Sequence, residues 1–323
     1  MHKIFAKIAT TIKKSNYILL TAHRNFDGDS LGSIISFIDF LENIKKEYSI
    51  LLPEKINADF NFLPHLNLME NKKIKSPIND DIKKFDTIII LDSADTSHTH
   101  LEQYFDELKT NSNIINIDHH MSNPYFGHIN CVNAKASSTA EIVFDFLKYI
   151  NYKIDKKLAT ALLCGIACDT EIFYNSATNQ NSTSQAAELL RLGANLNVIT
   201  KKIFKNQKIN YIKFFGMLLS KIKFNPILSV LTLIIKQDDL IKFNVNEDDI
   251  HGMANILKNI REAEVVLILK ETKEGKIKGS LRSKTVDVSK LATVLGGGGH
   301  RKAAGFAIDG KLMENNNGTW KII

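Results

Sequence analysis

The chain has 323 residues and a mass of 36.4 kDa, with 44% hydrophobic and 24% charged residues, which is the composition of a globular protein with room for two domains. Its apolar runs are far shorter than a membrane span, and lysines interrupt the N-terminal segment, so we expect a cytoplasmic protein without membrane contact. The net charge of +7 suits an anionic ligand, but the scattered lysines argue against a long nucleic-acid track, and three cysteines exclude a dense disulfide framework.

The first half of the chain alternates strand-like and helix-like segments. Short β-branched runs that end in polar residues are typical of central strands in a parallel sheet, and they occur at residues 17–21, 48–52, 87–91 and 114–117. Helical spacing predicts helices at residues 31–44, 138–150, 156–168 and 182–192. Ser137 or Ser138 can cap the second of these helices. We therefore predict an α/β domain over residues 1–195, with a mostly parallel sheet flanked by helices.

The second half of the chain has a different pattern. A lysine-rich helical stretch at about 198–223 has few turn residues, and we interpret residues 196–225 as a helical linker. Longer strands follow at 229–236, 264–271, 276–283 and about 305–308, with helices near 248–260 and 288–295. These segments predict a smaller α/β domain over residues 226–323.

Acidic residues and histidines follow four apolar segments of the first domain. The four groups are His23 with Asp27 and Asp29, Asp92 with Asp95, Asp118 with His119 and His120, and Asp169. Ligands of an open α/β sheet bind at the carboxyl ends of its strands, so we expect these side chains to converge at one edge. An Asp-x-Asp pair alone is more often a turn or a helix cap, and Asp95 is expected to cap the next segment. The recurrence of such residues after four segments favours a metal site instead.

The residue types predict which metals this site binds. Carboxylates so close together would repel one another unless cations held them, and oxygen with imidazole ligands suits manganese or magnesium. We expect Asp27 and Asp29 to diverge from an extended loop toward two metal positions, with Asp92 bridging both. His119 and His120 are expected to point to opposite sides, so that one binds metal and the other faces substrate. Two such ions can generate a hydroxide and stabilise a phosphoryl displacement.

Four consecutive glycines, 296–299, precede His300 between a predicted helix and the last predicted strand. Glycine lets the backbone approach a ligand closely and present its N–H groups to an anion. His300, and Arg282 with Ser283, can add contacts to a phosphate. A flexible hinge is the alternative, and the basic residues beside the glycines favour phosphate binding.

These motifs together resemble the DHH/DHHA1 phosphoesterase family, and within it the NrnA type, which comprises nanoRNases and pAp phosphatases. The matching residues of the first domain are His23-x-x-x-Asp27-Gly28-Asp29, Asp92 with Asp95, Asp118-His119-His120, and Asp169-Thr170. Those of the second domain are Arg282-Ser283 and Gly297-Gly298-Gly299-His300 with Ala303-Ala304-Gly305. The resemblance implies a DHH domain, a DHHA1 domain and an active site in the cleft between them.

The resemblance also implies roles for individual residues. One manganese ion would be bound by His23, Asp27 and Asp92, and a second by Asp29, Asp92, His119 and Asp169, with magnesium or cobalt as alternatives. His120 would contact the scissile phosphate, supported by Asp118. The substrate's terminal phosphate would be bound by Arg282, Ser283, Gly297, Gly298, Gly299 and His300. Glu171 stands where the family often has glycine, which leaves the exact specificity open.

The function implied is manganese-dependent hydrolysis of pAp (adenosine 3′,5′-bisphosphate) and of very short single-stranded RNA to mononucleotides. Cleavage of c-di-AMP or its linear product pApA is an alternative that the motifs do not separate from it. A RecJ-like single-strand exonuclease is disfavoured by the length of the chain, and a family II inorganic pyrophosphatase by the glycine segment. A non-catalytic nucleotide sensor is disfavoured by the complete ligand set, and a homodimer stays open.

Overall fold

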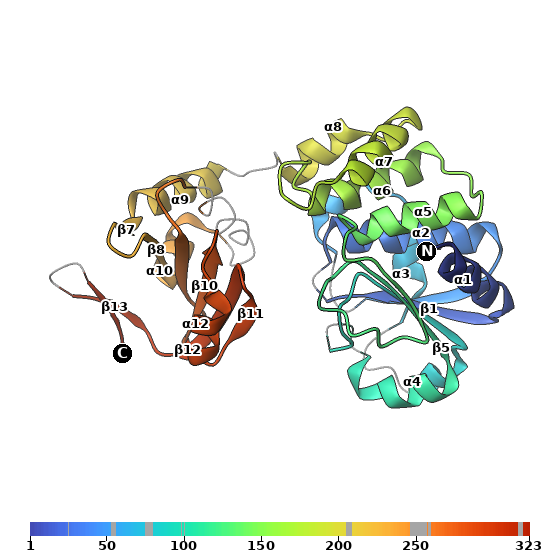
Figure 1. Ribbon diagram of the computed structural model, residues 1–323, viewed down its shortest axis with the longest axis horizontal. Coiled ribbons are helices and arrows are strands. Elements are labelled where there is room, and N and C mark those ends of the chain that lie inside the picture. The colour runs from blue at the N-terminus through green and yellow to red at the C-terminus, as the bar shows by residue number, and fades with distance from the viewer. Residues whose placement is uncertain are drawn as a thin grey trace. The chain divides into compact units, whose positions relative to one another are not determined.

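The computed structural model of the chain describes residues 1–24, 26–52, 56–74, 80–97, 99, 101–204, 209–245, 257, 260–315 and 319–323. The chain divides into two compact units, Met1–Asn206 and Gln207–Ile323 (Figure 1). The division falls inside residues 196–225, the segment that we interpreted as a helical linker. Helix α9 (Ile209–Ser220) buries Phe214 and Leu218 in a core of the second unit.

A six-stranded parallel sheet forms the centre of the first unit, in the order β3-β2-β1-β4-β5-β6. The strands are β1 (Tyr17–Ala22), β2 (Glu47–Leu51), β3 (Lys73–Ile74), β4 (Thr87–Leu91), β5 (Asn113–Asp118) and β6 (Ile129–Val132). All five residues of β4 are buried, as the apolar run predicts for a strand covered on both faces. The predicted parallel sheet is confirmed, and β3 and β6 are strands that the sequence patterns did not indicate.

Helices cover both faces of this sheet (Figure 1). The bounds are α1 (His2–Lys14), α2 (Gly28–Asn43), α3 (Leu66–Asn71), α4 (Phe105–Asn111), α5 (Thr139–Tyr149), α6 (Lys156–Asp169), α7 (Gln180–Arg191) and α8 (Leu196–Ile199). Short 3₁₀ segments lie at Ala58–Phe60, Asp80–Lys84 and Glu102–Tyr104, and a π-helical turn at Thr200–Phe204. Alternate strand residues contact α1, α2, α5 and α6 on one face and α4 on the other. The apolar alternation therefore fixes a three-layer α/β unit.

The second unit is built on a mixed six-stranded sheet in the order β11-β12-β10-β9-β8-β7, with a separate β13-β14 hairpin. The strands are β7 (Lys223–Asn225), β8 (Val230–Ile235), β9 (Val265–Glu271), β10 (Lys276–Ser283), β11 (Gly298–His300), β12 (Ala303–Asp309), β13 (Leu312–Glu314) and β14 (Trp320–Ile322). Its further helices are α10 (Gln237–Phe243) and α12 (Val288–Val294). The helix predicted at 248–260 falls almost entirely outside the described residues.

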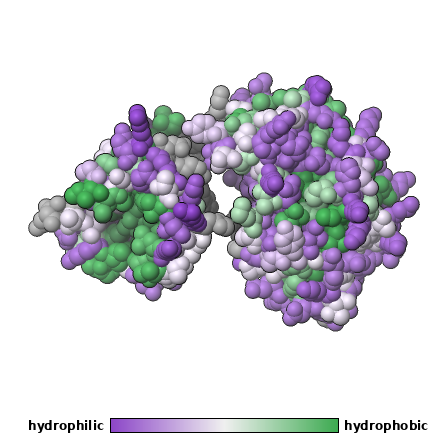
Figure 2. Space-filling model, in the orientation of Figure 1, coloured by the Kyte–Doolittle hydropathy of each residue, from purple (hydrophilic) through white to green (hydrophobic). Residues whose placement is uncertain are grey.

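The two units differ in how completely their sheets are covered. In β9, Val266 and Ile268 are buried against α9 and α10, whereas the residues that alternate with them are only half-buried. Figure 2 shows hydrophobic surface gathered on the visible face of the second unit, while that of the first is mostly hydrophilic. Among the described residues, none of the helices combines the length and the apolar character needed to cross a bilayer.

Candidate metal centre

Asp27 and Asp29 lie at the start of α2. Asp27 is the N-cap, and its Oδ1 accepts the backbone N–H groups of Asp29 (2.9 Å) and Ser30 (3.0 Å). Asp29 is in the first helical turn, so the predicted extended loop is wrong at this residue. The capping hydrogen bonds are the reason, because an N-cap carboxylate satisfies donors that a helix start leaves free. Asp27 is therefore both a helix cap and a neighbour of His23, whose Nε2 lies 3.9 Å from its Oδ1.

Asp92 is the centre of the cluster. It directly follows β4, is 2% exposed and has a φ of 53°, a left-handed conformation that aspartate adopts more readily than most residues. Its Oδ2 lies 3.2 Å from His23 Nε2, and its Oδ1 lies 3.7 Å from His119 Nε2 and 3.9 Å from His120 Nδ1. Imidazoles from two separate segments thus converge on one carboxylate.

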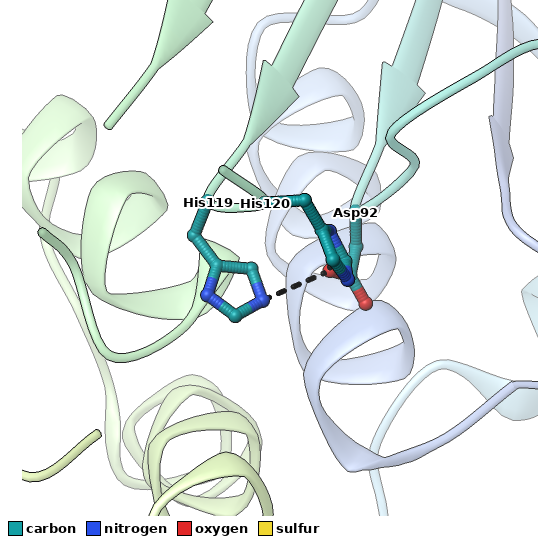
Figure 3. A group of neighbouring side chains, drawn as sticks. All are labelled: Asp92, His119 and His120. Atoms are coloured by element: carbon teal, nitrogen blue, oxygen red, sulfur yellow. Dashed lines mark ion pairs between the residues drawn. The ribbon is translucent and has the colours of Figure 1, made fainter. Parts of the chain in front are cut away.

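The two histidines after β5 lie side by side, with ring centroids 4.6 Å apart (Figure 3). The prediction that they point to opposite sides is wrong, because β5 ends at Asp118 and the chain turns there, with Asn123 N–H donating to the His120 carbonyl. His120 Nδ1 is 2.7 Å from Asp118 Oδ1, and the other oxygen of Asp118 accepts the Asn123 amide at 2.6 Å. Asp118 thus supports His120 and is itself buried and held.

Asp169 reaches the cluster from the last residue of α6, so it follows a helix and the other three groups follow strands. Its Oδ2 lies 3.1 Å from His119 Nε2. The structure therefore brings together all six residues predicted to bind metal, although from three strand ends and one helix end. A cavity of about 360 Å³ opens onto this cluster, and Asp95 lines it with Ser93, Ala94 and Ser122.

Three overlapping groups of side chains offer donor atoms that lie within 4.8 Å of one another. They are His23, Asp27 and Asp92; Asp29, His119 and Asp169; and Asp92, His119 and His120. The donors are carboxylate oxygens and imidazole nitrogens, the ligands that manganese and magnesium accept. The arrangement fits divalent cations, and the overlap allows Asp92 and His119 to serve neighbouring positions.

The negative charges of the carboxylates in the cluster are not balanced by enough nearby positive charge. Burial, followed by the charges of Asp92 and its neighbours, raises the pKa of Asp29 and Asp169 well above the usual range, and the pKa of Asp27 is raised for the same reasons. Burial also opposes ionisation of Asp92, but the hydrogen bond from His23 and the charges of the nearby histidines outweigh it and lower the Asp92 pKa. A cation bound here would relieve this repulsion.

The stability of the metal-free protein is expected to fall as the pH rises from about 5 to about 8. Groups with a raised pKa in the folded state stabilise it while protonated, and that stability is lost as the pH passes upward through their folded pKa. Asp27, Asp29 and Asp169 act in this direction, and so do His23 and His120, whose pKa is raised. Melting temperatures measured with chelator and with manganese test this, because the increase caused by metal should grow with pH. An increase that shrinks as the pH rises would contradict the electrostatic account.

Most of the predicted phosphate-binding residues of the second unit lie on β10 and β11, the two strands that flank β12. In the sheet register, Arg282 of β10 pairs with Ala303 of β12, and β11 pairs His300 with the same Ala303 from the other side. His300 thus lies at the same level of the sheet as Arg282, and Gly298 and Gly299 lie at the level of Ser280 and Leu281.

The glycine segment is not the open loop that the sequence suggested. Gly296, with a φ of 73°, ends α12, and β11 begins at Gly298. A Cβ on Gly297 would lie 2.1 Å from the Gly305 carbonyl oxygen, and one on Gly299 would lie 2.6 Å from Ala304 Cα. Close packing against β12 therefore explains Gly297 and Gly299. Nothing lies within 4 Å of a Cβ built on Gly298, so packing does not explain that glycine.

Two buried polar residues that contact the cluster were missed by the sequence patterns. Thr139, the first residue of α5, donates its hydroxyl to Asp92 Oδ1 (3.1 Å) and its N–H to Asp29 Oδ2 (2.6 Å). Asn123 donates to Asp118, as described above. Thr139 directly follows the predicted N-cap residues, but helical spacing alone cannot tell which side chain of a first turn meets another segment of the chain.

Comparisons with known proteins agree with these motifs. The N-terminal domain model of the DHH family matches residues 17–166, and the DHHA1 domain model matches residues 228–317. A protein of Thermus thermophilus named bifunctional oligoribonuclease and PAP phosphatase NrnA is 28% identical over 310 residues, which cover 95% of this chain and 88% of that protein. A Bacillus subtilis protein of the same name is 23% identical over 305 residues, covering 94% and 92%.

Among solved structures, an exopolyphosphatase-related protein from Bacteroides fragilis has the same fold, with a TM-score of 0.86 at 23% identity over 96% of this chain and 92% of that one. The two domain models match in the order in which the structure places the units. The chain therefore belongs to the DHH/DHHA1 family, with a DHH N-terminal domain followed by a DHHA1 domain.

Proposed function

We propose that this protein is a two-metal, manganese-dependent phosphoesterase that hydrolyses pAp and very short oligoribonucleotides to mononucleotides. The observation that carries the proposal is the convergence of carboxylate and imidazole side chains at one cavity, with Asp92 at the centre of the cluster. The names of the relatives from Thermus thermophilus and Bacillus subtilis support the choice of substrates.

We expect the residues of the cluster to have different roles in the reaction. His23, Asp27 and Asp92 would hold one metal ion, and Asp29, Asp92, His119 and Asp169 the other. Bound metal ions supply an activated hydroxide and stabilise charge on the phosphoryl oxygens. Asp118 holds His120 through Nδ1, which leaves Nε2 to contact the scissile phosphate and to hold or donate a proton there.

Hydrolysis of a substrate series with manganese tests this function. The series comprises pAp, RNAs of about two to five nucleotides, pApA, c-di-AMP, pyrophosphate and long single-stranded DNA. Turnover of pAp and short RNA that a chelator abolishes is the expected result. Turnover of only pApA or c-di-AMP, only pyrophosphate or only long DNA would each replace the proposed substrates with another phosphoester or phosphoanhydride. Tight nucleotide binding without any turnover would overturn the enzymatic function.

We expect the second domain to bind the terminal phosphate of the substrate through Arg282, Ser283, His300 and the backbone of Gly297, Gly298 and Gly299. Burial lowers the pKa of the Arg282 guanidinium, which stays charged at neutral pH. The absence of a packing reason for Gly298 supports close approach of a ligand to the backbone there.

Arg282→Gln is expected to raise the KM for pAp about 10- to 100-fold, because a charge-assisted hydrogen bond to phosphate is lost. Manganese affinity should not change, since the metal-binding residues are all in the first unit. Lys278→Gln is the matched control, because it removes the same charge from an exposed position of the same strand. Steady-state kinetics and calorimetric metal titration make the measurement. Equal KM values for the two variants would contradict the phosphate-binding role.

A further inference from the structure

Thr139 contacts two of the carboxylates in the metal cluster at once. Its N–H donates to Asp29 Oδ2 at 2.6 Å, and its hydroxyl donates to Asp92 Oδ1 at 3.1 Å. The next residue, Ala140, donates its N–H to the other oxygen of Asp29 at 2.7 Å. Thr139 and Asp29 are fully buried and Asp92 is 2% exposed. One threonine therefore links a carboxylate of α2 with the carboxylate that follows β4.

The position of Thr139 in its helix frees its hydroxyl for this contact. Other threonines inside helices of this protein donate their hydroxyl to the carbonyl four residues earlier, as Thr160 does to Lys156 (2.8 Å) and Thr10 to Ala6 (2.8 Å). Thr139 is the first residue of α5, and the residue four positions before it lies outside the helix. Its hydroxyl donates across to Asp92 instead, and its β-branched side chain has few rotamers in which to do so.

The start of α5 is itself held in place, so Thr139 is a fixed donor. Ser138 caps the helix by accepting the Glu141 N–H, and the buried Glu141 carboxylate accepts the N–H (2.8 Å) and hydroxyl (2.7 Å) of Ser137. On the other side, a Cβ on Gly165 would lie 2.5 Å from Ala140 Cβ and 2.9 Å from Asp29 Oδ1. Helix α6 thus packs directly against α5 and Asp29 at Gly165, where a larger side chain would not fit.

The negative charges of Asp29 and Asp92 explain why a fixed hydrogen-bond donor between them matters. Asp29 and Asp92 both accept hydrogen bonds from Thr139, and two ionised carboxylates this close to each other repel. Before metal binds, this repulsion alone does not determine the direction in which the carboxylate oxygens point. The direction is determined by the N–H groups of Thr139 and Ala140, at the positive end of the 11-residue helix α5, and by the hydroxyl of Thr139.

We infer that Thr139 is a positioning residue that holds Asp29 and Asp92 in the orientation in which they bind metal. The inference rests on the proposed function in so far as these carboxylates are metal ligands. Its hydroxyl contributes through Asp92 and its backbone N–H through Asp29. Removal of the hydroxyl alone should weaken metal binding and leave the helix cap intact.

Manganese titration of the metal-stripped protein by calorimetry tests this role without any substrate. Thr139→Val keeps the shape and the N–H but removes the hydroxyl, and its manganese affinity should fall about 10- to 100-fold. Thr139→Ser restores a hydroxyl and should bind within about threefold of the wild type. Thr160→Val is the matched control, because it removes a helix hydroxyl away from the cluster, and it should bind manganese as the wild type does.

The melting temperature of each variant in chelator separates positioning from stability. Thr139→Val and Thr160→Val should melt at similar temperatures while differing in manganese affinity. Unchanged manganese affinity of Thr139→Val, or an equal loss in Thr160→Val, would overturn the inference, as would a wild type that binds no manganese. A wild type that binds manganese but hydrolyses none of the substrate series would refute the proposed function and leave the role of Thr139 standing.

Discussion

Asp92→Asn is expected to reduce turnover of pAp by at least about a thousandfold. Asp92 is the residue on which His23, His119 and His120 converge, and each proposed metal position includes it. Asparagine is the better substitution than alanine because it tolerates the left-handed backbone at this residue, where φ is 53°. The variant loses a negative charge and one strong ligand oxygen but keeps its volume and its backbone conformation.

The measurement pairs turnover with metal content after dialysis, determined by mass spectrometry. The Asp92→Asn protein should retain much less manganese than the wild type and still unfold cooperatively. Asp39→Asn is the matched control, because Asp39 is a half-buried carboxylate of the same unit that contacts His65 (2.7 Å) and Tyr152 (2.7 Å), away from the cluster. Near-normal turnover of Asp92→Asn would exclude it as the shared ligand.

His120→Ala is expected to lower kcat by about 10²- to 10⁴-fold with little change in manganese affinity. Asp118 holds one nitrogen of His120, and this hydrogen bond, aided by the charges of Asp118 and Asp92, raises its pKa despite burial. The raised pKa suits a group that holds a proton near the scissile phosphate.

The neighbouring histidine provides the contrast. His119 lies 3.1 Å from Asp169 and belongs to the group with Asp29, so His119→Ala should lose manganese as well as turnover. His128→Ala, which removes a ring that accepts the Ile114 N–H at 3.0 Å, controls for the loss of an imidazole elsewhere. If His120→Ala loses as much manganese as His119→Ala, then His120 is a ligand and the division of roles between the two is wrong.

Much of the fold follows from local patterns. The strands β1, β4, β5 and β10 lie within one residue of their predicted bounds, because each is a run of apolar or alternating residues that ends in polar ones. The cap of α5 was also predictable, since Ser138 with Glu141 three residues later is a local signal. Short or edge elements such as β3, β6 and β7 carry no such signal, because two to four residues are too few to show a period.

The same distinction applies to the metal centre. The sequence by itself determined which residues could bind metal, because carboxylates and histidines after apolar segments mark the ligand-binding edge of a parallel sheet. Only the tertiary structure decided their geometry: Asp27 caps a helix, both histidines lie beside Asp92, and Asp169 contacts His119. The contacts of Thr139 with the cluster were also revealed only by the tertiary structure, because its two carboxylate partners are 110 and 47 residues away in the chain. Periodicity reports which face of its own segment a residue occupies, whereas packing between segments decides what that face contacts.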